Sequence, residues 1–186
     1  MATEPEQPQR FRTQVPPGDD RPRQVCDTCG FVQYDNPKVV VGAVVRSGAR
    51  ILLCRRAIAP QKGLWTLPAG YLEHHETAED GARREAWEEA RAALEIERLL
   101  AVYSIPRISQ IQLMFRARLA RPDIAAGPES LEVALFDWDD IPWNELAFPS
   151  VHWALHQARS VWDRDDFPVF SNPSGASGDA WAPSPN

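Results

Sequence analysis

Hydrophobic and polar positions in the middle of the chain follow the pattern of paired strands. Residues 38–45 form a β-branched run, a turn follows at Ser47-Gly48, and residues 49–54 form a second apolar run. Two such runs around a short glycine turn predict a β-hairpin. A short apolar stretch at residues 64–67 follows, and strand-type composition returns at residues 99–103, 110–119 and 131–138.

Two other segments have the composition of helices. Residues 77–94 are rich in Ala, Glu and Arg, which favour helix, and Thr77 is a suitable N-cap with Asp80 three positions later. A second helix is expected within residues 145–162, beginning near Ser150. Strands that alternate with helices predict an α/β (α+β) fold, a mixed sheet held between helices in an α/β/α arrangement.

The two ends of the chain differ from this central part. Residues 1–22 and 163–186 are polar and rich in proline, so we expect a disordered N-terminal segment and a flexible C-terminal tail. Residues 38–162 then form the main domain, and residues 23–37 form a small knuckle that precedes it. A chain of 186 residues suits one such domain.

Charge and cysteine content exclude several classes of protein. The net charge of −6 argues against a nucleic-acid polymer or an anionic membrane as partner. Three cysteines give no disulfide framework, and we find neither a secretory signal nor an apolar run of about 18 residues. We therefore expect a cytoplasmic protein without a membrane span.

Three glutamates in the first predicted helix carry the candidate chemistry. Glu85, Glu88 and Glu89 are spaced i, i+3 and i+4, which places their carboxylates on one helix face. An ordinary solvated face balanced by Arg84 is one interpretation. A magnesium or manganese site is the other, because these ions prefer hard oxygen ligands.

The wider spacing favours the metal site. Gly70 precedes Glu76 by six positions, and Arg84-Glu85 follows eight positions after Glu76. The segment thereby resembles the Nudix box, G-x5-E-x7-R-E-x2-E-E, and the chain is identified as a member of the Nudix hydrolase family. The glycine that usually lies near the end of the box is Arg91 here.

This resemblance implies the Nudix fold and a magnesium-dependent enzyme that cleaves a pyrophosphate bond. It implies that Glu85, Glu88 and Glu89 are metal ligands, joined by the backbone carbonyl of Gly70. Glu88, Glu89 and Arg84 are then catalytic, with Arg84 orienting a glutamate, and Glu76 has the structural role of fixing the loop against the helix.

The resemblance extends over roughly residues 24–158, to the branch that includes a chloroplast enzyme acting on FAD and ADP-ribose. It implies FAD, cleaved to FMN and AMP, as the first candidate substrate and ADP-ribose as the second. The SQPWPFPxS array typical of NADH diphosphatases is absent, which disfavours NADH. A diphosphatase acting on NADH or another dinucleotide is kept as an alternative. A non-catalytic nucleotide-sensing module is a further alternative.

Residues outside the box supply further candidates. The family often takes another ligand or a catalytic base from the region of Glu129 and Glu132, and Glu129 is our first choice. Arg107 and Gln110, in a loop between two strands, are candidate substrate-binding residues. Trp65 and Tyr103 are expected to pack in the core, although either could stack on a base.

Cys26-x2-Cys29 is half of a zinc ribbon, and a structural zinc site needs four ligands. Cys54 is expected to be a buried small side chain, and His152 and His156 to lie on the second helix without binding metal. We therefore expect no bound zinc, unless two chains share the ion. The partner is a small nucleotide derivative, and a homodimer remains open by analogy with the family.

Overall fold

The computed structural model describes residues 10–178, and the chain divides into two compact units, Met1–Asn36 and Pro37–Asn186. The first unit contains a three-stranded antiparallel sheet of β1 (Phe11–Gln14), β2 (Arg23–Cys26) and β3 (Val32–Gln33). The expectation of disorder is therefore wrong for residues 10–22. Backbone pairing of Phe11 with Cys26 requires few apolar side chains, so composition does not reveal it. Residues 1–9 lie outside the described part.

The predicted knuckle is a tight turn after β2. The Gly30 amide donates to the Cys26 carbonyl at 3.0 Å, and the Cys26 amide donates to the Phe31 carbonyl at 2.8 Å. Gly30 has φ +75°, a conformation that glycine adopts without strain. This turn buries Cys26 and leaves Cys29 exposed.

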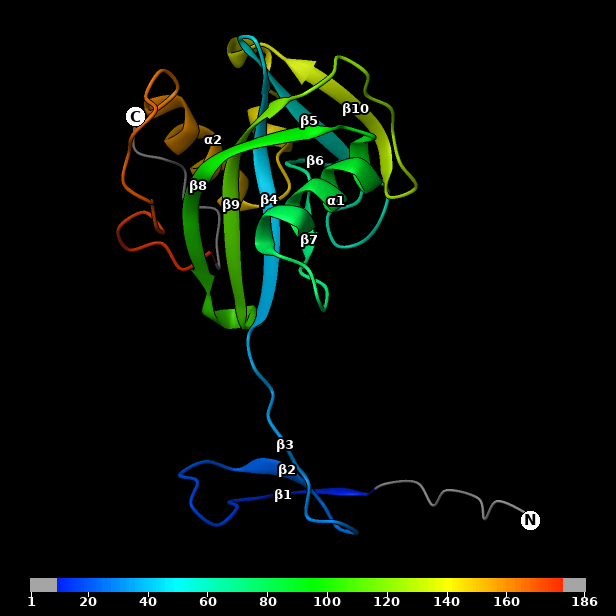
Figure 1. Cartoon of the computed structure of the whole chain (residues 1–186), viewed down its shortest axis with the longest axis vertical. Coiled ribbons are helices and arrows are strands. Elements are labelled where there is room, and N and C mark those ends of the chain that lie inside the picture. Colours follow the sequence, from blue (N-terminus) through cyan, green and yellow to red (C-terminus); the bar gives the residue numbers. More distant parts are fainter. Residues whose placement is uncertain (1–9, 179–186) are drawn as a thin grey trace, which may run out of the picture. The chain divides into compact units, whose positions relative to one another are not determined.

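The second unit is built on a mixed sheet with the strand order β10-β5-β4-β9-β8 (Figure 1). β4 and β9 are parallel, and the other neighbours are antiparallel. Two short strands pair outside this path, β6 (Trp65–Thr66) with β5 and β7 (Ala69–Tyr71) with β4. The main strands are β4 (Lys38–Ser47), β5 (Arg50–Arg56), β8 (Leu94–Ile105), β9 (Gln110–Leu119) and β10 (Ser130–Phe136).

Two helices cover opposite faces of this sheet, α1 (Ala78–Ala90) and α2 (Pro149–Ser160). Alternate residues of β4 show the two faces: Val41 and Val45 pack in the cluster that contains the α1 alanines, whereas Val44 packs in the α2 cluster. The predicted mixed sheet between helices, and the predicted β4–β5 hairpin, are confirmed.

Local interactions set the limits of α1. The Thr77 hydroxyl accepts a hydrogen bond from the Asp80 amide at 3.1 Å, which confirms the predicted N-cap. Arg91 ends the helix in a left-handed conformation with φ 51°, so α1 ends before residue 94, where the prediction placed its end. Arg91 takes the left-handed conformation that glycine usually adopts at a helix end, and for a residue with a Cβ this conformation is strained.

Three short 3₁₀ turns complete the unit: η1 (Pro106–Ile108) joins β8 to β9, and η2 (Trp138–Asp140) and η3 (Trp143–Glu145) lie between β10 and α2. β10 therefore ends at Phe136, two residues before the predicted limit.

The segment after α2 is ordered through residue 178, so the expected flexible tail is wrong over residues 163–178. Phe167 is buried, with the Arg116 guanidinium 4.7 Å from its ring centre. The Phe170 amide donates to the Leu100 carbonyl at 2.9 Å, and its carbonyl accepts from the Val102 amide at 2.9 Å. These edge contacts have no sequence periodicity, and residues 179–186 lie outside the described part.

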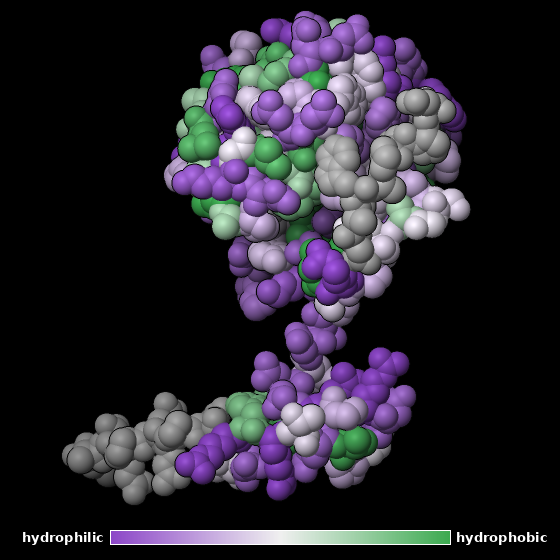
Figure 2. All heavy atoms as spheres, turned by 180° about the vertical axis from the view of Figure 1, so that it is seen from behind, coloured by the Kyte–Doolittle hydropathy of each residue, from purple (hydrophilic) through white to green (hydrophobic). Residues whose placement is uncertain are grey.

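Hydrophilic atoms cover much of the face seen in Figure 2, with hydrophobic atoms in separate groups. Within residues 10–178, neither helix has the length and apolar composition that crossing a membrane requires.

Candidate active site

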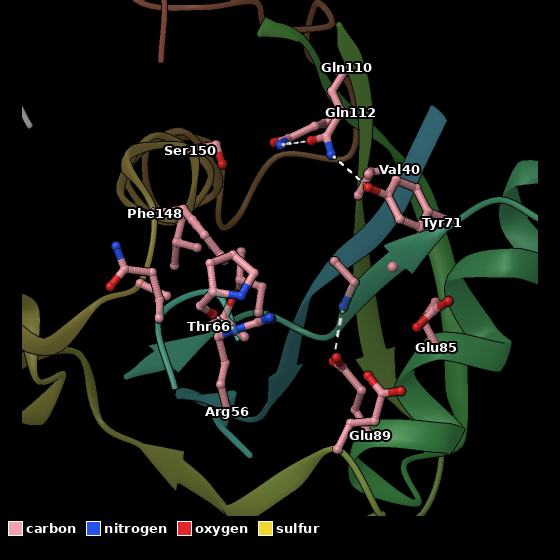
Figure 3. A pocket seen from close by; sticks show the side chains of 18 of the residues that line it. Val40, Arg56, Thr66, Tyr71, Glu85, Glu89, Gln110, Gln112, Phe148 and Ser150 are labelled. Atoms are coloured by element: carbon pink, nitrogen blue, oxygen red, sulfur yellow. Dashed lines mark hydrogen bonds between the residues drawn. The ribbon is translucent and has the colours of Figure 1, made fainter. Parts of the chain in front are cut away.

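A pocket of about 1080 Å³ lies in the second unit, next to α1 (Figure 3). In this view Glu85 and Glu89 extend from α1, and Arg56 and Phe148 lie across from them. The pocket therefore joins the carboxylate face of the helix to segments far apart in the sequence. Its walls come from β7 (Ala69, Gly70, Tyr71), α1 (Arg84, Glu85, Glu88, Glu89), the loops at Arg56–Gln61 and Pro128–Glu129, the β8–β9 turn (Ile105, Arg107, Ile108, Gln110) and the start of α2 (Phe148, Ser150).

Arg84 holds the loop before α1 in place. Its Nε and Nη2 donate to the two oxygens of Glu76 at 3.0 and 2.8 Å, and Nη2 also donates to the Tyr71 carbonyl at 2.9 Å. Glu76 in turn accepts from the Glu73 amide at 2.7 Å. The hydrogen bond from Arg84 is the main reason that the pKa of Glu76 lies below its usual value. Glu76 thus lies between the loop at Glu73 and α1.

The same guanidinium reaches the carboxylate face of α1. Its Nη1 donates to Glu85 at 2.7 Å and to Glu88 at 3.0 Å. One positive group therefore lies between two carboxylates that would otherwise repel each other. This geometry shows that Glu85 and Glu88 can share a cationic partner.

Glu89 lies deeper than the other two glutamates, and it is 6% exposed. Burial raises its pKa to about 8, against the opposing effect of the hydrogen bond that the Ala69 amide donates to it at 3.1 Å. Burial also raises the pKa of Glu85, and the hydrogen bond from Arg84 opposes this shift. Two buried carboxylates on one helix face are costly without compensating positive charge.

Two glycines allow the backbone to approach these carboxylates closely. A Cβ at Gly70 would overlap the Glu85 carboxylate, and a Cβ at Gly127 would overlap the Glu88 carbonyl. The Gly127 amide also donates to the Glu89 carbonyl at 2.9 Å. The Gly127 contact brings the loop of Glu129 against α1, and the charge of Glu129 contributes to the raised pKa of both Glu85 and Glu89.

The chemistry of these donors fits a divalent cation. The carboxylates of Glu85, Glu88 and Glu89 are hard oxygen ligands, and close approach of Gly70 brings its backbone to the same place. Within residues 10–178 no three acidic, cysteine or histidine side chains already converge as the ligands of one ion. Arg84 occupies oxygens of Glu85 and Glu88, so the full ligand set requires local rearrangement.

The structure separates the other candidates. Arg107, Gln110 and Glu129 line the pocket, whereas Glu132 lies outside its lining, 3.7 Å from Arg55. Trp65 and Tyr103 are buried in the core, as expected.

The pocket residues that sequence reasoning missed include Arg56, Tyr71, Gln112 and Phe148. The Arg56 guanidinium lies 5.3 Å from the Phe148 ring centre, and Gln110 donates to the Tyr71 hydroxyl at 3.3 Å. Because they come from different strands and loops, no spacing in the sequence links them. The one available signal was an aromatic residue inside the box, Tyr71, directly after Gly70.

Cys54 and the two helix histidines are not part of the pocket lining. Cys54 is buried, which raises its pKa, and Cys26 and Cys29 lie in the first unit. His156 stacks on Trp143 with 4.9 Å between ring centres, and His152 lies 5.7 Å from the same ring. The two histidines therefore pack beside an aromatic side chain.

The comparison with protein families decides the assignment. The family model of the NUDIX domain matches residues 36–157 of this chain. The chain belongs to the Nudix family. A second model, described as Nudix N-terminal, matches residues 9–35 and so covers the three-stranded unit.

Two curated proteins illustrate the sequence similarity. The ADP-ribose pyrophosphatase of Methanocaldococcus jannaschii is 34% identical over 119 residues, which cover 62% of this chain and 69% of that protein. The NAD-capped RNA hydrolase NudC of Chromobacterium violaceum is 30% identical over 135 residues, or 72% of this chain, but only 50% of NudC. The Nudix chain thus spans half the length of that relative.

Solved structures show the same fold. A NUDIX hydrolase from Nitrosomonas europaea is 44% identical, covers 87% of this chain and 93% of its own, and has a TM-score of 0.80. The NUDIX domain of Shewanella oneidensis NrtR, solved with ADP ribose, is 21% identical, covers 69% and 90%, and has a TM-score of 0.59. The second similarity supports the fold alone. This chain is therefore a Nudix hydrolase by family and by fold.

Proposed function

We propose that this Nudix hydrolase cleaves the pyrophosphate bond of ADP-ribose or a closely related nucleoside diphosphate derivative, with Mg²⁺ or Mn²⁺ as cofactor. The observation that carries the proposal is the placement of Glu85 and Glu89, two buried carboxylates, in the lining of one large pocket. Arg84 supplies one positive charge, to Glu85, so burial of two carboxylates is not fully compensated in the protein alone, and a cation bound with the substrate would offset the remainder.

The residues of this chain prepare the site in three ways. Glu85, Glu88 and Glu89, with the Gly70 carbonyl, would hold the cation, and the Ala69 amide fixes the position of Glu89. Arg84 donates hydrogen bonds to the Gly70–Glu76 loop and so holds this loop, with the Gly70 carbonyl, next to the glutamates of α1. A bound Mg²⁺ supplies Lewis-acid polarisation of the phosphoryl oxygens and lowers the pKa of a bound water.

Glu129 is the proposed extra ligand or general base. It lines the pocket from the loop that Gly127 packs against α1, so its carboxylate can approach a water at the reacting phosphorus. General-base catalysis requires such a group within hydrogen-bonding reach of the attacking water.

ADP-ribose replaces FAD as the first candidate because the M. jannaschii relative carries that activity in its name. FAD, which the branch-level resemblance implied, becomes the second candidate. The pocket volume of about 1080 Å³ is large enough for either class of molecule. Retention of every carboxylate of the box supports an enzyme over a purely sensing module.

Turnover of a substrate panel tests the proposal. With Mg²⁺ we expect hydrolysis of ADP-ribose to AMP and ribose 5-phosphate, and chromatography of the products measures the rate. Addition of EDTA should abolish this activity. FAD, NADH, diadenosine polyphosphates and nucleoside triphosphates complete the panel. No turnover of any member would contradict the enzyme proposal, and preference for triphosphates would contradict only the substrate class.

Glu129→Gln is expected to lower kcat about 100-fold, because a positioned general base contributes roughly 10²–10⁴-fold. Glu132→Gln is the matched control, since Glu132 is on the same stretch, outside the pocket lining. Steady-state kinetics with ADP-ribose measure both variants. Equal activity of the two variants would remove Glu129 from the mechanism.

A further inference from the structure

The segment after Phe167 runs beside β8 toward the pocket. After the backbone pairing of Phe170 with β8, the Asn172 side chain continues the pattern: its Oδ1 accepts from the Ser104 amide at 2.9 Å and its Nδ2 donates to the Ser104 carbonyl at 2.8 Å. An amide side chain thereby replaces a backbone neighbour at this edge of the sheet. The segment covers strand groups that would otherwise be open.

Further hydrogen bonds fix this segment to α2 and shape its turn. Gln157 of α2 donates to the Ser171 carbonyl at 3.0 Å and accepts from the hydroxyl of the buried Tyr103. Asn172 also donates to the Ala176 carbonyl at 2.9 Å, which closes the turn over residues 172–176. The position of the following residues is therefore determined by β8 and α2 together.

The segment reaches the substrate pocket at Gly178. Gly178 is part of the pocket lining, as is its neighbour in space Ile105, the last residue of β8. A Cβ added at Gly178 would overlap the Ile105 side chain. Ile105 in turn leads into the β8–β9 turn, which places Arg107 and Gln110 in the same lining.

We propose that Gly178, held in place by the contacts of residues 170–176, forms part of the wall of the substrate pocket and limits the size of the group that binds against Ile105 and the β8–β9 turn. The group concerned is a non-reacting end of the nucleoside diphosphate derivative, so the inference rests on the proposed function. Asn172 acts as a positioning residue for this wall, and Gly178 determines specificity because it leaves room for Ile105.

Two glycines of the segment form a matched pair for the test. Gly178 and Gly175 have nearly the same backbone conformation, with φ +80° and +76°, so alanine strains both in the same way. Only Gly178 lines the pocket, and a Cβ at Gly175 would meet no atom within 4 Å. Comparison of Gly178→Ala with Gly175→Ala therefore separates the effect of a side chain at Ile105 and the pocket from the effect of the backbone strain that both variants share.

The probe is the non-hydrolysable α,β-methylene analogue of ADP-ribose with Mg²⁺, and calorimetry measures its Kd. We expect Gly178→Ala to weaken binding roughly tenfold, as a one-carbon change in a binding pocket does, with Gly175→Ala close to wild type. Thermal unfolding should shift in both variants through the same backbone strain, and further in Gly178→Ala, whose Cβ also displaces the Ile105 side chain. With ADP-ribose itself, Gly178→Ala should raise KM and leave kcat nearly unchanged.

The outcomes separate this inference from the proposed function. Binding of the analogue without hydrolysis of any panel member would contradict the proposed function. The Kd values of Gly178→Ala and Gly175→Ala would still test whether Gly178 limits the pocket. Equal Kd values for the two alanine variants would contradict the proposal that Gly178 limits the pocket. Failure of the wild-type protein to bind the analogue would contradict it as well.

Discussion

Glu89→Gln is expected to lower kcat for ADP-ribose on the order of 10³-fold, since a metal ion stabilises several kcal/mol of transition-state charge and each 1.4 kcal/mol is tenfold. Glu89 is the most buried of the box carboxylates, and the Ala69 amide fixes its orientation. The amide of glutamine keeps the volume and removes the charge. The loss should therefore come from the cation and not from altered packing.

Thermal unfolding with and without Mg²⁺ distinguishes these causes. Mg²⁺ should raise the Tm of the wild type, because a ligand that binds the folded state stabilises it, and should raise the Tm of Glu89→Gln much less. Without metal and at a pH above about 8, where Glu89 is ionised, the variant should be at least as stable as the wild type, since it no longer buries a charge. Glu79→Gln, on the first turn of the same helix and exposed, is the control.

The result that would contradict this assignment is equally specific. If Glu89→Gln retained turnover and the same Mg²⁺-dependent Tm shift as Glu79→Gln, Glu89 would not be a ligand. A large loss of activity with an unchanged Tm shift would instead place Glu89 in the chemical step and leave cation binding to Glu85 and Glu88.

The sequence predicted those parts of the fold that are governed by local pattern. The limits of β9, Gln110–Leu119, coincide with the predicted run, and the Thr77 cap begins α1 where the helical composition begins. Helix periodicity places Glu85, Glu88 and Glu89 on one face of α1, whereas Gly70 and Glu76 precede the helix and were linked to it by their spacing alone. Burial of Glu85 and Glu89, in contrast, depends on β7 and on the loop of Gly127.

Contacts between distant segments were beyond the reach of sequence reasoning. The tail packs through one aromatic residue, Phe167, and through backbone pairing at Phe170, and neither produces a repeating pattern. β1 likewise forms from residues with little hydrophobic content, because its partner strand supplies the hydrogen bonds. Arg56 and Phe148 meet in the pocket from β5 and the loop before α2, which only the folded chain brings together.

Arg84→Lys is the second substitution with a large expected effect, because it should reduce both activity and stability. A lysine cannot reproduce the fork of donors that Arg84 directs at both oxygens of Glu76, at the Tyr71 carbonyl and at Glu85. We expect kcat/KM to fall about 10–100-fold, as when the partner of a metal ligand is lost. The free energy of unfolding should fall by about 2 kcal/mol, as when a hydrogen bond to a charged group is lost.

Arg83→Lys is the matched control, because the neighbouring Arg83 is exposed and pairs only with Asp80, at 2.8 Å, among the ion pairs of the described residues. Denaturant unfolding and steady-state kinetics at several Mg²⁺ concentrations separate the two roles of Arg84. If Arg84 positions the ligands, its replacement raises the Mg²⁺ concentration needed for half-maximal rate, which a loss of stability alone would not do. An unchanged Mg²⁺ requirement would limit Arg84 to holding the Gly70–Glu76 loop against α1.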